Sequence, residues 1–164
     1  MFPDDIQASA AAVIEAAIKA GVMVATAESC TGGLVSGALT AIAGSSAVLD
    51  RGFVTYSNEA KGEMLGVSDD LLARFGAVSE PVAQAMALGA VQRSRASVAV
   101  SITGVAGPGG GSAEKPVGLV HFAAVGRSGA VVHVERRFGD IGREEVRLES
   151  VRVALSLLLD AVTA

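Results

Sequence analysis

Apolar side chains recur along the chain with two different periods, and these periods divide it into helices and strands. Ile6, Ala10, Val13 and Ile14 are spaced as one face of a helix, which Gly21 ends. The same period predicts further helices at 34–42, 58–65, 68–76, 80–95 and, capped by Asp140, 140–162. Runs rich in β-branched residues predict strands at 22–27, 52–56, 97–103, 117–125 and 130–138.

The order of these elements predicts the class of fold. Helices alternate with strands in the first part of the chain, and one hairpin, turning at 126–129, comes late. This order is typical of an α/β protein with helices layered on a mixed, mostly parallel sheet. Neither a linker nor an internal repeat is evident, so we expect a single domain over residues 1–164.

The composition agrees with a buried core and narrows the expected partners. Hydrophobic residues make up 51% of the 164 positions and charged residues 18%. The formal net charge is −4 and no Trp is present, so we expect no direct binding of nucleic acid. No segment resembles a membrane span or a signal peptide, which predicts a cytoplasmic protein. With one cysteine, Cys30, and no Cys/His cluster, we expect neither a disulfide nor a metal site.

The first candidate site is the segment 28–33, Glu-Ser-Cys-Thr-Gly-Gly, which follows the strand at 22–27. Ligands of open α/β sheets bind at the carboxyl ends of strands, and a helix N-terminus favours anions. Ser29 there is either a nucleophile, with neighbouring N–H groups as oxyanion donors, or, like Thr31, a simple helix cap. The pattern alone favours the cap.

The second candidate is the glycine cluster at 104–112, after the strand at 97–103. Glycines let a backbone approach a phosphate closely and present several N–H groups to it. The cluster is not a Walker A loop, because no Gly-Lys-Ser/Thr follows, and Ser112 replaces the last Gly of the dinucleotide fingerprint. A phosphate-binding nest and a surface loop are both compatible with this pattern.

A nucleophilic Ser29 requires a base, and the chain offers few. His121 and His133 lie within predicted strands without an evident Asp partner, so a Ser-His-Asp triad has little support. Lys61 follows the strand at 52–56, where loss of solvent would lower its pKa and let it accept a proton. The alternative for Lys61 is a surface residue, and Cys30 is either a small buried residue or an acidified thiol.

Several segments together resemble the CinA C-terminal domain family. The resemblance runs from about Ile6 to Leu159. The segments that carry it are 26–33 (TAESCTGG), 44–46 (GSS), 52–61 (GFVTYSNEAK), 76–81 (GAVSEP) and 103–110 (TGVAGPGG). It implies a three-layer α/β/α fold and hydrolysis of nicotinamide mononucleotide to nicotinate mononucleotide and ammonia, without a cofactor. It also implies a catalytic pair, Ser29 and Lys61, with Tyr56 as a further candidate catalytic residue and Thr103 in the same pocket.

The resemblance further implies a homo-oligomer of two or more copies. It does not extend to the N-terminal, molybdopterin-binding-like domain of the longer family members, so functions of that domain are not expected here. A module that binds pyridine nucleotides and regulates without catalysis is the alternative function.

The phosphate of the implied substrate needs hydrogen-bond donors, although neither glycine turn contains a Lys or Arg. We therefore expect backbone N–H groups to provide much of the binding. Besides Thr103, the expected substrate-binding positions in the two turns are Cys30, Thr31, Gly32, Gly33, Gly104, Gly107 and Gly109. Arg143 is the cation expected beside the phosphate, and the alternative for it is an exposed arginine in the first turn of the last helix.

Overall fold

The computed structural model describes all 164 residues. Its elements follow one another as α1 (Asp4–Ala20), β1 (Val24–Glu28), α2 (Leu34–Thr40), the 3-10 turn η1 (Ser45–Ala47), β2 (Leu49–Val54), α3 (Asn58–Leu65), α4 (Asp69–Phe75), α5 (Glu80–Gln92), β3 (Val98–Gly104), β4 (Leu119–Val125), β5 (Val131–Arg137) and α6 (Arg143–Thr163). The last helix begins later than expected, because Gly142, with φ of 100°, keeps the preceding backbone out of helical geometry. Asp140 is therefore not its cap.

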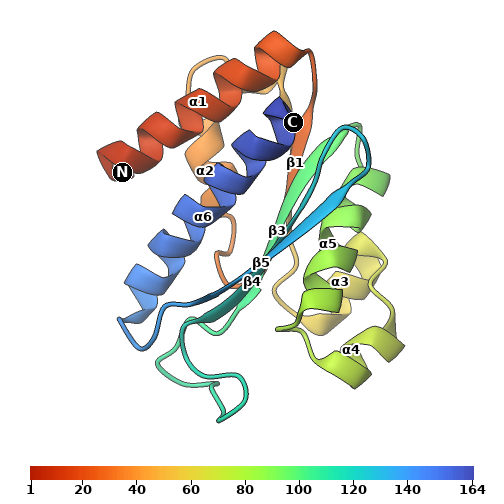
Figure 1. The fold of residues 1–164 in the computed structure, drawn as a ribbon, viewed down its shortest axis with the longest axis vertical. Helices are drawn as coiled ribbons and strands as arrows, with labels where there is room; N and C mark the ends of the chain where they lie inside the picture. Colours follow the sequence, from red (N-terminus) through yellow and green to blue (C-terminus); the bar gives the residue numbers. More distant parts are fainter.

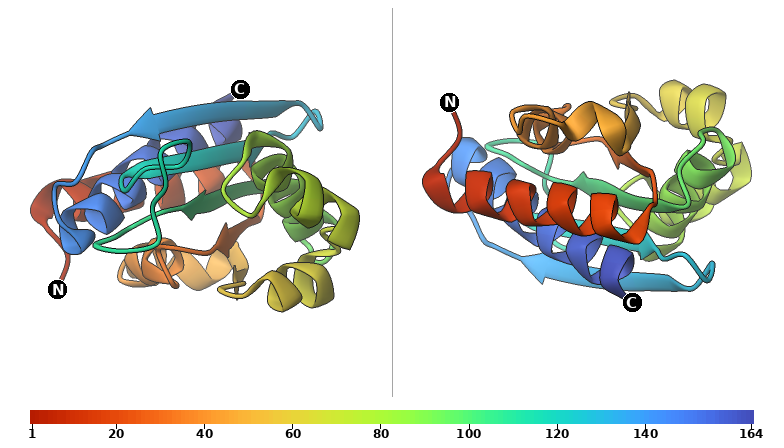
Figure 2. Two further views of the ribbon diagram at one scale, coloured as in Figure 1. Left: turned by 90° about the horizontal axis from the view of Figure 1, so that it is seen from below. Right: turned by 90° about the horizontal axis from the view of Figure 1, so that it is seen from above.

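The five strands form one sheet in the order β2-β1-β3-β4-β5. The strand β1 pairs in parallel with both β2 and β3, whereas β4 is antiparallel to β3 and to β5. Four strands thus point the same way and β4 runs against them, which confirms a mixed sheet. The two views in Figure 2 show β5 at one edge of this sheet.

Helices cover both faces of the sheet, as Figure 1 shows: α1, α2 and α6 lie on one side and α3, α4 and α5 on the other. The alternation of side chains along β1 feeds both layers, because Val24 packs in the α1–α2–α6 core and Ala25 and Ala27 pack beneath α5. The α/β/α arrangement is therefore confirmed. None of the helices combines the length and the apolar character that crossing a membrane requires.

Serine caps fix where three helices begin on the second face. The hydroxyl oxygen of Ser57 accepts from the N–H of Ala60, that of Ser68 from Leu71, and that of Ser79 from Val82. Each cap is worth about 1 kcal/mol. These caps match the helix starts expected from the sequence, and the first of them lies at the start of α3, the helix that carries Lys61.

The strands β1, β2 and β3 are parallel, so their carboxyl ends lie along the same edge of the sheet. In Figure 1 the labelled strands β1 and β3 run downward to this edge. The glycine-rich segment between β3 and β4 extends from this edge (Figure 1). In open α/β sheets this is the edge at which ligands bind.

Candidate active site

A pocket of about 300 Å³ opens at this edge, and its wall comes from segments far apart in the sequence. Its lining residues are Ser29, Cys30, Tyr56, Asn58, Lys61, Ala77, Val78, Thr103, Gly104, Val105, Ala106, Gly107, Gly109, Gly110 and Arg143. The expected residues Ser29, Tyr56, Lys61, Thr103 and Arg143 thus share one pocket. No carboxylate lines it.

Ser29 and Lys61 face each other at the base of the pocket. The Nζ atom of Lys61 lies 3.1 Å from Ser29 Oγ and donates to the carbonyl oxygen of Thr55 at 2.8 Å. Only 1% of Lys61 and 8% of Ser29 is exposed. This burial lowers the pKa of Lys61 below its ordinary value of 10.5, since leaving water disfavours the charged form. A neutral amine at this distance is able to accept the serine proton.

Thr55 is the structural link between the strands and this pair. Its N–H donates to the carbonyl oxygen of Glu28 at 2.8 Å, which extends the pairing of β1 and β2 by one residue. Its carbonyl oxygen then receives the Lys61 ammonium or amine. The end of β2 therefore sets the distance between α3, which carries Lys61, and the turn after β1, which carries Ser29.

The N-terminus of α2 is already capped by a carboxylate of the chain itself. Glu28 is fully buried and accepts from the N–H groups of Val35 and Ser36 at 2.9 and 3.0 Å, and from Thr31 Oγ1 at 2.7 Å. This helix start is therefore closed to a substrate anion. Thr31, Gly32 and Gly33 were expected to bind substrate, and the structure places all three outside the pocket lining.

Neither Ser29 nor Thr31 caps the helix either. The residue at the cap position is Gly33, whose φ of 102° favours a residue without a side chain, so the side-chain cap of α2 comes from Glu28 instead. Thr31 instead donates its hydroxyl to Glu28. The reading of Ser29 as a simple cap is thus excluded, and its hydroxyl faces Lys61.

Cys30 lines the pocket, but its thiol is not an acidified nucleophile. Burial raises the pKa of Cys30 to about 12, so that the thiol stays protonated at neutral pH. The alternative of a small, buried cysteine is the one that the structure supports.

The two histidines form a pair of their own, away from Ser29. Their rings stack with centroids 5.1 Å apart, and His121 Nδ1 lies 2.9 Å from His133 Nε2. Neither residue lines the pocket, so a Ser-His-Asp triad is excluded. Lys115 also points elsewhere, to the carbonyl oxygen of Phe75, which leaves Lys61 as the base beside Ser29.

Arg143 joins three parts of the pocket wall. Its Nη1 donates to the carbonyl oxygen of Gly107 at 2.7 Å, and its Nη2 to the Tyr56 hydroxyl at 3.0 Å. The side chain is exposed, but these contacts place it over the pocket rather than in free solvent. Gly104, Gly107 and Gly109 line the pocket beside it, as expected.

Thr103 lies in the pocket with its hydroxyl proton already in use. Its Oγ1 donates to the carbonyl oxygen of Ala77 at 2.9 Å. In this geometry the hydroxyl is able to accept a hydrogen bond from a ligand but has no second proton to donate. Its contribution to an oxyanion site is therefore not as a donor.

Sequence reasoning missed three residues that shape the site. Asn58 lines the pocket, and its place two residues after Tyr56, just past a strand, was a usable signal. Glu28 caps α2 from within the core, and Arg147 of α6 reaches the turn after β1. No pattern links Arg147 to a turn more than a hundred residues earlier. No three His, Cys, Asp or Glu side chains gather as a metal ion would require.

Comparison with known proteins agrees with the likeness noted in the sequence. The model of the CinA C-terminal domain matches residues 6–162. The chain is 56% identical over 148 residues to nicotinamide-nucleotide amidohydrolase PncC of Enterobacter agglomerans, covering 89% of each chain. It is also 56% identical over 144 residues to the protein of that name in Escherichia coli K12, covering 87% of this chain and 86% of the other.

A solved structure shows the same likeness in three dimensions. The crystal structure of competence/damage inducible protein CihA from Agrobacterium tumefaciens superimposes with a TM-score of 0.97. The two sequences are 60% identical, and the match covers 100% of this chain and 99% of the other.

Proposed function

This chain belongs to the CinA C-terminal domain family, and from that premise we propose that it is an amidohydrolase. Its reaction is the hydrolysis of nicotinamide mononucleotide to nicotinate mononucleotide and ammonia, the activity named for relatives that are 56% identical over most of the chain. The observation that carries the catalytic part of the proposal is the buried contact of 3.1 Å between Lys61 Nζ and Ser29 Oγ at the base of the pocket.

The first half of the proposed reaction forms an acyl-enzyme. Neutral Lys61 takes the hydroxyl proton of Ser29 while Ser29 Oγ bonds to the carboxamide carbon. The tetrahedral intermediate then breaks its C–N bond, and the Lys61 ammonium returns its proton to the nitrogen, which leaves as ammonia. The burial that lowers the pKa of Lys61 makes the amine available for the first of these transfers.

The second half uses the same two groups in reverse. A water molecule attacks the ester carbon while Lys61 accepts one of its protons, and the C–O bond to Ser29 breaks as that proton returns to Ser29 Oγ. The oxyanion of each intermediate requires donors. The N–H of Cys30 follows the nucleophile directly and donates to no backbone carbonyl, so it is our candidate for one of them.

Tyr56 lines the same pocket as the catalytic pair, and we infer that it also binds the substrate. The residue is 62% exposed and lines the pocket, and its hydroxyl accepts a hydrogen bond from Arg143. The pyridinium ring of the substrate is a cation, which the face of an aromatic ring attracts. This attraction is useful in a pocket whose lining contains no carboxylate.

The deciding experiment is incubation of the purified protein with nicotinamide mononucleotide, with ammonia and nicotinate mononucleotide both quantified. We expect equal amounts of the two products. A protein that binds the nucleotide over many hours without releasing either product would instead be the non-catalytic regulatory module. If a related amide in a small substrate panel is hydrolysed and nicotinamide mononucleotide is not, the proposed substrate is wrong and the proposed reaction, amide hydrolysis, still stands.

The phosphate end of the substrate leads to a prediction for Arg143. Two of its five N–H donors are used by Gly107 and Tyr56, and the others remain available for a phosphate. We expect Arg143→Ala to raise KM for nicotinamide mononucleotide about tenfold, because a charge-assisted contact is lost. Turnover of the phosphate-free nucleoside should change much less, and steady-state kinetics on both substrates will measure the difference.

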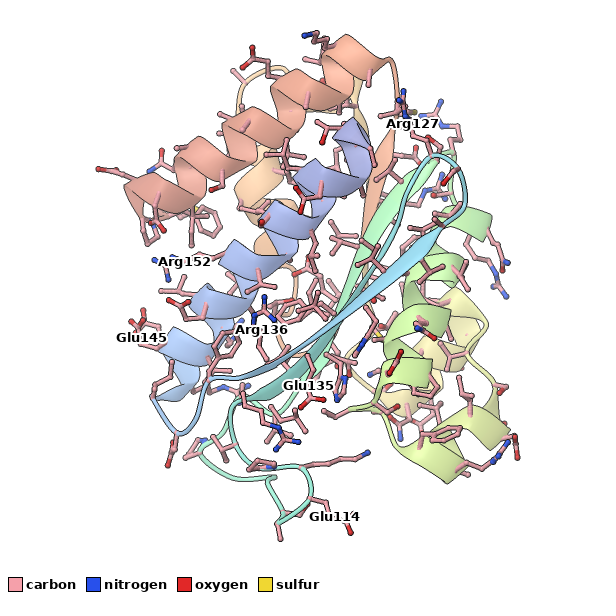
Figure 3. The ribbon with its side chains drawn as sticks, in the orientation of Figure 1. Glu114, Arg127, Glu135, Arg136, Glu145 and Arg152 are labelled. Atoms are coloured by element: carbon pink, nitrogen blue, oxygen red, sulfur yellow. The ribbon has the colours of Figure 1, made fainter.

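Arg136→Ala is the matched control for Arg143→Ala. Arg136 is exposed on β5, is labelled in Figure 3, and its guanidinium donates only to the backbone of Glu135. Removing its charge should leave both KM values close to wild type. If Arg143→Ala raises KM for the nucleotide and for the nucleoside by the same factor, Arg143 supports the pocket wall, and the glycine loop alone binds the phosphate.

A further inference from the structure

The turn that carries Ser29 is held by an arginine outside the pocket lining. Arg147 lies on α6, one helical turn after Arg143, and is half-buried. Its Nε donates to the carbonyl oxygen of Cys30 at 3.2 Å, and its Nη2 donates to that of Thr31 at 3.3 Å. The Thr31 oxygen also accepts from the N–H of Leu34, but Arg147 is the only donor to the Cys30 oxygen.

These two carbonyl groups fix the orientation of the turn. Cys30 and Thr31 are its central residues, and the N–H of Gly32 closes it on the carbonyl oxygen of Ser29 at 3.0 Å. Because a peptide unit is planar, holding its oxygen also fixes the N–H on its opposite side. Holding the Thr31 oxygen thus fixes the Gly32 N–H that closes the turn. The Ser29–Cys30 peptide, which carries the candidate oxyanion donor, is fixed through that bond.

Two side chains of opposite charge, Glu28 and Arg147, hold the turn through different backbone groups. The Glu28 carboxylate accepts hydrogen bonds from the hydroxyl of Thr31 in the turn and from the N–H groups of Val35 and Ser36 in α2. The Arg147 guanidinium donates hydrogen bonds to the carbonyl oxygens of Cys30 and Thr31. An arginine is suited to this, because its rigid fork reaches two neighbouring acceptors at once and its charge strengthens both hydrogen bonds.

We propose that Arg147 is a positioning residue for the amide hydrolysis: through the carbonyl groups of Cys30 and Thr31 it keeps Ser29 Oγ and the Cys30 N–H in reactive orientation. The inference rests on the proposed function, since it assigns a role in that reaction. Arg147 does not touch the substrate, so its effect falls on the chemical step and not on binding.

Loss of Arg147 therefore separates kcat from KM. We expect Arg147→Ala to lower kcat by roughly 10²-fold, the effect of a misplacement of about 1 Å, while KM changes little. Arg147→Lys, which supplies a single charged group without the fork, should fall between wild type and Arg147→Ala. Added guanidinium ion, at concentrations far below denaturing ones, should restore part of the kcat of Arg147→Ala.

The matched control is Arg152→Ala on the same helix. Arg152, labelled in Figure 3, forms ion pairs with Asp5 of α1 and with Glu149 and reaches no part of the pocket. Its loss should lower thermal stability without lowering kcat, and guanidinium should not stimulate it. If Arg147→Ala does not fold, Arg147→Lys and Arg152→Lys provide the same comparison.

A second readout does not depend on turnover. Amide hydrogen exchange of the peptide covering 28–36 should become faster in Arg147→Ala and stay unchanged in Arg152→Ala, because of these two arginines only Arg147 donates to that turn. Unchanged exchange, or a kcat within about twofold of wild type, would overturn the inference. If the wild type releases no ammonia, the proposed function fails, and faster exchange in Arg147→Ala would still establish that Arg147 holds the turn.

Discussion

Ser29→Ala is expected to abolish ammonia release almost completely, with kcat lower by on the order of 10³-fold or more. The reason is that no other nucleophile is in place. The Cys30 thiol beside it stays protonated, and the Thr103 hydroxyl donates its hydrogen bond to the carbonyl oxygen of Ala77 and has no base beside it. Binding should survive, since the methyl group leaves Tyr56, Arg143 and the glycine loop untouched. Calorimetric titration with the nucleotide will measure this directly.

Cys30→Ala is the comparison that separates serine from thiol chemistry. The thiol contributes pocket wall but no reactive anion, so this variant should lose activity far less than Ser29→Ala. The double variant Ser29→Ala/Lys61→Ala should be no worse than either single variant, because the two groups act as one unit. A Ser29→Ala protein that releases ammonia at a rate close to wild type contradicts the whole assignment.

The sequence predicted most of the fold because its local signals agree with the final packing. The stop at Gly21 lies where the pattern placed it, and the helices predicted at 58–65, 68–76 and 80–95 begin within one residue of their expected starts, each after a capping serine. The start of α6 was missed because Asp140 resembles a cap, whereas Gly142, with its φ of 100°, delays the helix. Competition between two local signals of this kind is decided by the loop's path across the molecule, which no short pattern contains.

The site was predictable where chemistry and position coincide, and not where it depends on a buried partner. Ser29, Lys61 and the glycine loop follow strand ends, and strand ends of a parallel sheet meet at one edge. The start of α2 was expected to bind an anion from outside, but Glu28 turns inward and occupies it. Whether a polar side chain faces the core or a ligand depends on packing, and the pattern of Glu-Ser-Cys-Thr-Gly-Gly is the same in both cases.

Substitution of Lys61 is expected to lower kcat as strongly as substitution of Ser29, and Lys61→Arg is the most informative variant. Lys61→Ala removes the base, and Lys61→Arg keeps a cation that does not release its proton at any relevant pH. If Lys61 acts as a base, both variants should lose on the order of 10³-fold in kcat. If it only supplies positive charge, Lys61→Arg should keep much of the activity. Added primary alkylamines should partly restore Lys61→Ala and not Lys61→Arg.

The pH dependence of the wild type has a definite sign. The amine is reactive only when neutral, so kcat/KM should rise with pH through the pKa of Lys61 in the free enzyme. Burial lowers that pKa, which puts the rise below 10.5. The pKa of the buried His121 is also lowered, from 6.5, but its ring lies outside the pocket. If kcat/KM of His121→Asn rises with pH as in the wild type, the ionisation is assigned to Lys61. If the rise is absent in His121→Asn, the ionisation belongs to His121 instead.

The same pKa governs stability, and this ties the chemistry of Lys61 to its burial. Between the lowered pKa and 10.5 the unfolded chain binds more protons than the folded protein, so the free energy of unfolding rises with pH in that interval. Lys61→Met lacks the group, so the stability of the wild type relative to this variant should be constant at lower pH and increase across the interval. Urea denaturation of both proteins over a pH series will measure it. The increase should begin where kcat/KM begins to rise, because one ionisation controls both; a flat difference would mean that Lys61 is not neutralised by burial and that another group supplies the base.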